Sequence, residues 1–483
     1  MVHRKCLTSC LPVLLAGLLL TTSYPAKALD TNPVTVSLKP RLIVLTDISS
    51  IQSGVREPDD AQSLIRLMLY ANEFDIEGLI ASSSLQHGHV VRPAYIRSIV
   101  DAYGQCRPNL VTHNKSYPDF YNKSYPTADQ LRQVIKSGQP NADNGISVSQ
   151  TIGAGKDTQA SNWIVSAVDK PDNRPVWVTI WGGPADLAQA LWKVKQTRSS
   201  AQVAKFVSKI RVVASGNQDP TAGWIKTNFP HMFYATRKEG GRGMYRGGDQ
   251  SLVSSSWVQH NIRGHGALGQ MYPDYHGGDI WSWKLGKVNG IKGGDSSSYM
   301  GLIRNGLNVP NTLTAENWGG RLQVDGRNHD RYWDAIDRVG NYQHDISPYI
   351  AAVYRWRPDF QPDYAARFDW CAKPYSQANH NPMNSTGNAV INERVASGKT
   401  IRLNSGDWSD PDGNNLAFHW QKMNEESSYG GGVSMQNGNT ASPSITAPNV
   451  SRTQSIHMLL TVEDDGEPSL VSYKRVNITV SPR

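Results

Sequence analysis

Three aspartates near the start of the chain have the residue type and spacing of a cation site. Asp47 ends an apolar run, and the pair Asp59-Asp60 opens the helical pattern that follows. Carboxylates crowded together repel one another unless a cation lies between them, and an all-oxygen set suits a hard ion such as Ca²⁺ or Mg²⁺. Alternatively, Asp59 and Asp60 serve only the N-terminus of a helix. That explanation accounts for the pair but not for Asp47.

A strand and a helix are predicted to position these carboxylates. Residues 41–47 are apolar and β-branched, which is typical of a buried parallel strand. Residues 61–70 carry apolar side chains at helical spacing. The carboxyl end of a first strand is where open α/β sheets bind their ligands. The pattern therefore places the aspartates at a ligand-binding edge.

Alternation of strand and helix continues to about residue 215. It predicts an α/β domain over residues 29–375, with an open and mostly parallel sheet covered on both faces. Residues 238–294 show little periodicity and are rich in Gly, Trp and Tyr. Further strands are expected at residues 76–82, 175–181 and 209–214, and helices at 92–103, 157–169 and 184–194.

The last hundred residues have a different pattern. Short apolar runs separated by turn signals such as Asp410-Pro411-Asp412-Gly413 predict a small antiparallel sandwich of immunoglobulin type over residues 382–483. Asx-turn chemistry explains the aspartates of these turns better than a second Ca²⁺ site does. Strands are expected at residues 400–403, 416–420, 455–462 and 473–480.

Residues 1–28 resemble a cleaved signal peptide, with a charged start, an apolar stretch and an A-x-A site at Ala26-Lys27-Ala28. Their removal would lower the net charge from +8 to +5. The protein is therefore expected to be secreted or periplasmic. The remaining positive charge is scattered, which argues against a nucleic acid polymer or a membrane as partner. Cys106 and Cys371 stay in the mature chain, and the sequence leaves open whether they pair.

Four separated segments resemble the nucleoside hydrolase family, and in particular a secreted, cellulose-binding-protein-like branch of it. Residues 45–60 resemble the aspartate-rich fingerprint of the family, and residues 182–191 (GGPADLAQAL) a segment that follows a strand. Residues 216–222 (GNQDPTA) are similar to the loop that contacts ribose, and residues 293–296 (GGDS) to the late metal-binding aspartate. Residues 317–321 (NWGGR) look like a signature of the secreted branch. The C-terminal turns resemble those of cadherin-like and PKD-like modules.

The resemblance implies one Ca²⁺ held by Asp47, Asp60, Asp295 and the carbonyl of Gly182. It implies that Asp47 is the general base for a water on that ion. Sugar hydroxyls would be held by Asp59 and Asn217.

Two further residues are candidates for substrate binding. His87 follows the second predicted strand at its carboxyl end, although a solvated loop position explains it equally well. Trp318 offers a face for stacking on a sugar or a base, as do Trp224 and Trp333, whereas Trp181 is expected in the core.

Two functions are compatible with these residues. The first is a secreted Ca²⁺-dependent hydrolase of N-ribosyl or related glycosidic bonds, acting on a nucleoside or a carbohydrate. The second is a non-catalytic protein that binds cellulose or another polysaccharide on a nucleoside hydrolase-like scaffold. The three metal-site aspartates favour the enzyme. The family's ribose-binding glutamate and asparagine are replaced here by Gly223 and Ile225, which favours binding or a different glycoside.

Overall fold

The computed structural model describes most of the chain after residue 37. The segment predicted to be a signal peptide and the candidate His87 lie outside the described residues. The described ranges are 38–52, 58–85, 90–116, 124–140, 146–278, 286–309, 312–340, 342–385, 387 and 390–483.

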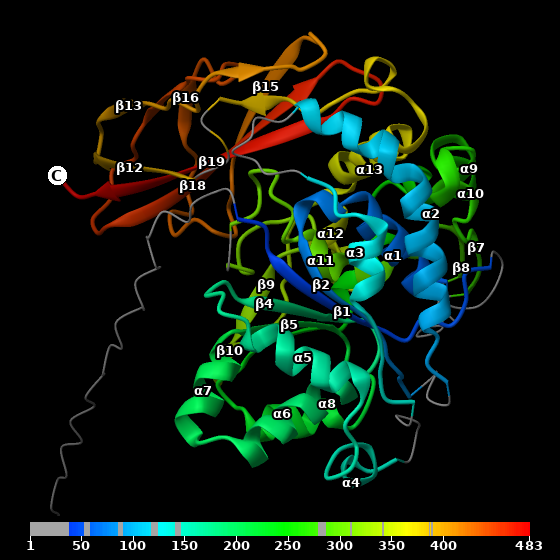
Figure 1. The fold of residues 1–483 in the computed structure, drawn as a ribbon. Coiled ribbons are helices and arrows are strands. Elements are labelled where there is room, and N and C mark those ends of the chain that lie inside the picture. Colours follow the sequence, from blue (N-terminus) through cyan, green and yellow to red (C-terminus); the bar gives the residue numbers. More distant parts are fainter. Residues whose placement is uncertain are drawn as a thin grey trace, which may run out of the picture. The chain divides into compact units, whose positions relative to one another are not determined.

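An eight-stranded sheet forms the centre of the α/β region, in the order β3-β2-β1-β4-β5-β6-β10-β9 (Figure 1). Every neighbouring pair is parallel except β10 and β9. This confirms the predicted open, mostly parallel sheet. The strands are β1 (Arg41–Thr46), β2 (Asp75–Ala81), β3 (Ile135–Ser137), β4 (Val176–Ile180), β5 (Ile210–Ser215), β6 (Phe233–Arg237), β9 (Leu322–Asp325) and β10 (Asn328–Asp334).

Helices cover both faces of this sheet, as Figure 1 shows. Alternate residues of β1 enter two separate apolar clusters, one on each face. The cluster that contains Leu42 and Val44 is covered by α1 (Asp59–Leu69), α2 (Pro93–Thr112) and α13 (Arg357–Ala372). The cluster that contains Ile43 and Leu45 is covered by α5 (Gln159–Asp169), α6 (Ala185–Thr197), α7 (Ser200–Ser208) and α8 (Thr221–Asn228).

Short elements join these layers, and several of them lie in the segment that showed little periodicity. The α-helices are α3 (Ala128–Gln133), α4 (Val148–Thr151), α9 (Ser255–Asn261), α10 (Gly266–Gln270), α11 (Ser297–Met300) and α12 (Ala351–Tyr354). The 3₁₀ turns are η1 (Ala71–Glu73), η2 (His113–Ser116), η4 (Gly240–Met244), η5 (Ser251–Val253), η7 (Gly294–Ser296), η8 (Tyr342–His344) and η9 (Tyr375–Gln377). A hairpin of β7 (Tyr275–Gly278) and β8 (Lys287–Gly290) precedes η7.

The C-terminal region consists of β-sheets, as predicted. Its four-stranded sheet has the order β12-β19-β18-β15, and its three-stranded sheet the order β13-β17-β16. The strand pairs of these two sheets are antiparallel as predicted, except that β12 pairs with β19 in parallel. The strands are β11 (Met383–Asn384), β12 (Ile391–Ala396), β13 (Thr400–Arg402), β14 (Trp408–Ser409), β15 (Leu416–Lys422), β16 (Ser434–Gln436), β17 (Ser444–Thr446), β18 (Gln454–Asp464) and β19 (Val471–Ser481).

The β-sheet region shares a core with the α/β region. Residues 36–483 form one compact unit. Leu459 and Tyr473 of the C-terminal strands belong to the same apolar cluster as the helices α1 and α13. The Tyr473 hydroxyl accepts a hydrogen bond from Trp318 Nε1 at 3.0 Å and donates one to Asp359. Burial of this joint stabilises both regions together.

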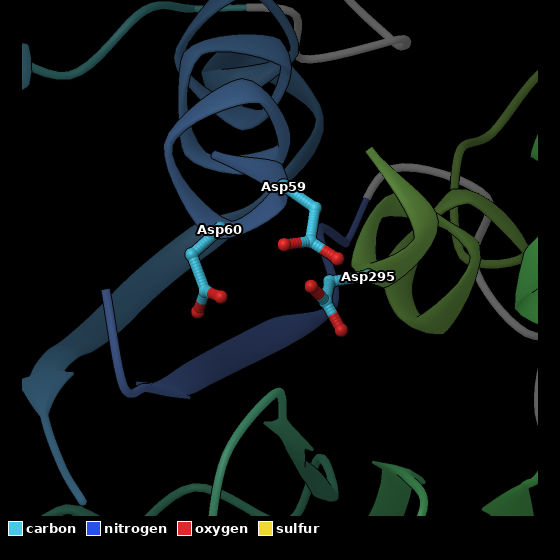
Figure 2. Close-up of side chains that lie close together, drawn as sticks. All are labelled: Asp59, Asp60 and Asp295. Carbon is cyan, nitrogen blue, oxygen red and sulfur yellow. The ribbon is translucent and has the colours of Figure 1, made fainter. Parts of the chain in front are cut away.

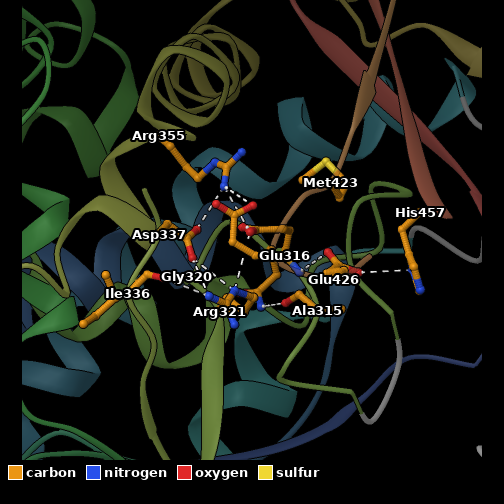
Figure 3. A network of polar contacts seen from close by, with 12 residues as sticks. Ala315, Glu316, Gly320, Arg321, Ile336, Asp337, Arg355, Met423, Glu426 and His457 are labelled. Carbon is orange, nitrogen blue, oxygen red and sulfur yellow. Dashed lines mark hydrogen bonds and ion pairs between the residues drawn. The ribbon is translucent and has the colours of Figure 1, made fainter. Parts of the chain in front are cut away.

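A buried polar network lies at the same joint (Figure 3). Arg475 of β19 donates to both carboxylate oxygens of Glu426, at 3.0 and 2.8 Å, and to the carbonyl of Glu316 at 2.8 Å. Oε1 of the Glu316 carboxylate in turn accepts a hydrogen bond from Arg355 Nη1 at 3.1 Å. Because buried charges are tolerated only when they are paired, this network fixes how residues 315–321 meet the C-terminal strands.

Across the described ranges, each helix is too short or too polar to pass through a lipid bilayer.

Candidate functional site

The structure brings Asp59, Asp60 and Asp295 together at the carboxyl edge of the sheet (Figure 2). Each offers a carboxylate oxygen, and these three oxygens lie within 4.8 Å of one another. Asp59 and Asp60 come from the first turn of α1, and Asp295 comes from η7. The family resemblance implied that Asp60 and Asp295 would lie together with Asp47 and that Asp59 would bind sugar hydroxyls, whereas the structure places Asp59 in the group with Asp60 and Asp295.

Asp47 follows β1 directly and joins the same group of charges. Its carboxylate is one of the causes that raise the pKa of both Asp60 and Asp295. Its side chain packs against the backbone of Gly182, where a Cβ would lie 2.7 Å from the Asp47 carboxyl carbon. A side chain at residue 182 would therefore displace Asp47. The neighbouring Gly183 is confined in the same way by Asp219, which explains the glycine pair after β4.

The carboxylates of the cluster repel one another when neither a proton nor a cation is bound between them. Burial, followed by the charges of Asp47, Asp295 and Asp59, raises the pKa of Asp60 well above its ordinary value. Burial and the charge of Asp59 do the same to Asp295, opposed by a hydrogen bond from Ser215 at the end of β5. Thr46 Oγ1 donates to Asp60 Oδ1 and partly offsets the effect. Like charges held this close favour either a proton or a cation.

Lys292 supplies a positive charge that the sequence analysis did not anticipate. Its Nζ lies 3.5 Å from Asp59 Oδ2, and its side chain is 1% exposed. It also lowers the pKa of Asp295. The only signal in the sequence was its place directly before the Gly293-Gly294-Asp295 segment. One ammonium beside four carboxylates leaves the cluster with net negative charge.

The helix that provides two of the aspartates also holds the loop that provides the third. Gln62 Oε1 accepts from the backbone N–H of Lys292 at 2.7 Å and of Gly293 at 2.8 Å. Ser63 Oγ accepts from the N–H of Ser296 at 3.1 Å. Residues 59–63 therefore position Asp295 as well as Asp59 and Asp60.

Two other aspartates connect the loops at this edge of the sheet through hydrogen bonds. Asp219 accepts from the N–H of Ala185 at 3.0 Å and of Thr221 at 2.7 Å, which joins the loops after β4 and β5. Asp186 accepts from the N–H of Gln139 at 3.0 Å and from Thr158 Oγ1 at 2.7 Å. Burial raises the pKa of both carboxyls to about 6. These residues support the site and do not belong to the acidic cluster.

The other predicted substrate-binding residues lie in different environments, one exposed and one buried. Asn217 is exposed on the loop after β5, and its Oδ1 accepts from Lys226 Nζ at 3.2 Å. Trp318 is 2% exposed and packs between Phe360 and Tyr473 in the joint with the C-terminal strands. The buried indole offers no exposed face for stacking on a substrate, so the structure does not support its predicted role. Trp181 is in the core, as expected.

The donor set fits a hard cation. The described ligand atoms are all carboxylate oxygens, and such atoms are the preferred ligands of Ca²⁺. Asp59 Oδ1 is buried and has no hydrogen-bond partner among the described residues. A buried carboxylate oxygen without a donor costs free energy unless a cation or water satisfies it. The arrangement can therefore hold a hard cation.

A solved structure matches this chain along almost its whole length. It is a nucleoside hydrolase-related hypothetical protein from Saccharophagus degradans, described as associated with carbohydrate metabolism. The two sequences are 32% identical, the match covers 92% of this chain and 100% of that one, and the TM-score is 0.74.

Two partial matches have TM-scores of 0.14 and 0.15 at 19% identity. One is the PKD domain of the KIAA 1837 protein, which matches 19% of this chain and 82% of its own. The other is a three-repeat fragment of the mouse protocadherin PcdhgC3, which matches 23% of this chain and 35% of its own. No curated protein matches the sequence.

Two family models match the chain. Residues 400–480 match the C-terminal domain of the cellulose-binding protein Sde0182. Residues 41–322, more than half of the chain, match the model described as cellulose-binding Sde182, nucleoside hydrolase-like domain. This second match includes β1, α1 and η7, and with them every carboxylate of the cluster. The chain belongs to the cellulose-binding Sde182 family with a nucleoside hydrolase-like domain.

Proposed function

We propose that this protein is an exported, Ca²⁺-dependent hydrolase of glycosidic bonds. The observation that carries the proposal is the convergence of Asp59, Asp60 and Asp295 within 4.8 Å, with Asp47 beside them. A scaffold without chemistry gains nothing from buried carboxylates that raise one another's pKa. Export is supported by the signal-like segment at residues 1–28.

The ion would be held by Asp47, Asp60, Asp295 and the carbonyl of Gly182. When bound, Ca²⁺ supplies a positive charge that lowers the pKa of a water molecule and offsets the repulsion among the carboxylates. Asp47 accepts a proton from the attacking water as general base. The remaining carboxylates stabilise the positive charge that develops on the sugar ring in an oxocarbenium-like transition state. Asp59 and Asn217 hold sugar hydroxyls.

The residues near the carboxylate cluster fit a carbohydrate substrate better than an ordinary nucleoside. Ile225 stands where nucleoside hydrolases carry a ribose-binding asparagine, and it is fully buried in the apolar cluster under β5. Gly223 stands at the position of the family's glutamate and offers no side chain. Two contacts to ribose are therefore lost, whereas the carboxylate cluster is complete. We infer that the substrate is an oligosaccharide or a polysaccharide fragment.

Incubation of the mature chain with nucleosides and with oligosaccharides tests this function. Release of reducing sugar is measured with Ca²⁺ and with a chelator. Release that requires Ca²⁺ and is lost in Asp47→Asn supports the proposal. Full turnover by Asp47→Asn of any substrate that the parent hydrolyses contradicts it.

A second candidate, polysaccharide binding without hydrolysis, is favoured by Trp333. This residue lies at the carboxyl end of β10 and is 47% exposed. It pairs with Thr236 of β6, so both side chains point to the same face of the sheet. Thr236 Oγ1 and Asn217 Oδ1 both accept from Lys226 Nζ. An exposed indole beside these polar groups suits the C–H face of a sugar and its hydroxyls.

Depletion of the protein from solution by insoluble cellulose separates the two candidates. Retention on cellulose without release of sugar from any glycoside supports binding alone. Trp333→Ala should reduce retention, and Trp333→Phe should restore part of it. Val324→Ala, which trims another exposed residue of the same sheet, serves as the control. Equal retention of all three variants contradicts a role for Trp333.

A further inference from the structure

Two cysteines that the proposed function does not use lie on helices that pack together. Cys106 belongs to α2 and Cys371 to α13, and both are buried. Both are free thiols in this structure. Asn109 Nδ2 of α2 donates to the carbonyl of Lys373 at 2.8 Å, which fixes the end of α13 beside α2. The two cysteines are thus held at a rigid crossing of two helices.

Gly266 shows that both side chains enter the same space. It has φ +69°, and a Cβ on it would lie 2.9 Å from Cys106 Sγ and 3.0 Å from Cys371 Cβ. Cys106 Sγ and Cys371 Cβ are therefore close neighbours on the same side of Gly266. A disulfide requires its two Cβ atoms about 3.5–4.5 Å apart. With no side chain at residue 266, the side chains of both cysteines occupy this space, and their thiols are hydrogen-bonded to each other.

In the folded chain the environment makes one of the two thiols more acidic than the other. The Cys371 thiol, and then the backbone N–H groups of Leu268 and Ala267, act against burial and lower the pKa of Cys106 to about 7. Burial raises the pKa of Cys371. The thiolate is the attacking form in thiol–disulfide exchange. In the folded chain Cys106 is therefore the more readily ionised of the two thiols.

We propose that Cys106 and Cys371 form a disulfide bond in the exported protein. In an oxidising compartment the partner is the disulfide of a thiol–disulfide oxidoreductase. The thiolate of one of the two cysteines attacks one sulfur of that disulfide, whose S–S bond breaks and whose other sulfur leaves as a thiolate. The other cysteine then loses its proton and attacks the sulfur of the first, which releases the second oxidoreductase thiolate. Two electrons and two protons pass to the oxidoreductase, and one S–S bond forms in this chain.

The bond would close a loop that contains most of the α/β region. It would tie α2 to α13, and α13 carries Asp359, which accepts from Tyr473 of the C-terminal strands. Cross-linking of a long loop stabilises chiefly by restricting the unfolded chain. Because both sulfurs are buried, exchange takes place before α13 packs on α2.

Mass spectrometry of the mature chain, which has no cysteine besides these two, tests the proposal. The protein is exported by its host, treated with iodoacetamide during cell lysis, and then denatured in fresh iodoacetamide. No alkyl group is expected without reduction, and two after reduction. A peptide map should contain a cross-linked pair with Cys106 and Cys371. Two alkyl groups on unreduced protein would overturn the proposal.

Single variants test whether each cysteine protects the other from alkylation. Cys106→Ser should add one alkyl group at Cys371 without reduction, and Cys371→Ser one at Cys106. Failure of either to be alkylated in denatured protein would mean that the sulfur is blocked by something else, and would contradict the pairing. The unreduced parent should unfold about 5–10 °C above the reduced parent. The double variant Cys106→Ser/Cys371→Ser should show no response to reductant.

Discussion

Gly182 lies directly against the carboxylate of Asp47, with no room for a Cβ between them. The contact joins the end of β4 to the residue that follows β1, its neighbour in the sheet. The position of the proposed general base thus depends on the absence of a side chain two residues beyond the neighbouring strand.

Gly182→Ala should impair the site without unfolding the protein. The new Cβ would lie 2.7 Å from the carboxyl carbon of Asp47, so Asp47 must move. We expect at least a tenfold loss of Ca²⁺ affinity, measured by calorimetric titration. Gly223→Ala is the matched control, because it lies in α8 with open space around its Cβ position. That change should stabilise the helix by about 0.5–1 kcal/mol. Unchanged affinity in Gly182→Ala would contradict the role of this contact.

Asp47→Asn and Asp59→Asn should separate catalysis from substrate binding. An amide at residue 47 keeps the shape but cannot accept a proton, so hydrolysis should fall about 10²–10⁴-fold. Asp59→Asn should raise KM for the substrate more than it weakens Ca²⁺ binding. Both variants are compared with the parent for sugar release and Ca²⁺ affinity. If the two changes have the same effects, the assignment of separate roles is wrong.

Lys292→Met should strengthen Ca²⁺ binding. The ammonium lies 3.5 Å from Asp59 Oδ2 and repels a cation at the cluster. Its removal should raise the affinity by about tenfold, or about 1.4 kcal/mol, which is moderate for charges at an effective dielectric constant of about 20. The metal-free protein should lose stability, because the carboxylates lose their counter-charge. Lys287→Met, an exposed change on β8, is the control. A weaker affinity in Lys292→Met would refute this electrostatic account.

Asp186 should make stability depend on pH between about 4 and 6. Its folded pKa is about 6, above the value near 3.9 of an unfolded aspartate. The folded chain therefore binds more protons in this window, and its stability falls as the pH rises. The loss is at most about 1.4 kcal/mol per pH unit. Denaturant unfolding at several pH values should show a shallower decline in Asp186→Asn than in the parent. An equal decline in both would disprove the contribution.

Arg475→Met should destabilise the joint between the two regions. Arg475 is 1% exposed and is hydrogen-bonded to Glu426 and to the carbonyl of Glu316. Removal of one partner of a buried ion pair costs about 3–5 kcal/mol, because the other charge is left unpaired. Urea unfolding measures the loss, with the exposed Arg394→Met of β12 as control. A loss no larger than that of the control would show that the network contributes little.

The local part of the site could be predicted from the sequence. Asp47, Asp59 and Asp60 belong to one strand–helix unit, so their periodicity alone puts them at one edge of the sheet. Asp295 could not be placed in this way, because it follows a long segment without periodicity, and only the resemblance identified it. The position of Lys292 directly before Gly293 was too weak a signal, since a single lysine in a glycine-rich segment does not reveal which carboxylate it faces.

Trp318 shows why composition misleads at a joint between regions. An aromatic residue in a glycine-rich segment suggests a ligand platform, yet Trp318 is enclosed by Phe360 and Tyr473. Tyr473 lies in the C-terminal strands, and sequence reasoning treated those strands as a separate body. Strand β10 was missed because its partner β6 was not predicted either. Contacts between distant segments decide such positions.

The shared core limits how the C-terminal strands can be exchanged during evolution or engineering. A module that is connected by a flexible linker can be grafted onto a new host as a cassette. Here Glu316 and Trp318 would be left facing a foreign surface, one without the guanidinium of Arg475 and the hydroxyl of Tyr473. A working chimera would have to carry residues 315–321 and 355–360 along with residues 400–480. The two regions are therefore expected to be inherited as a pair.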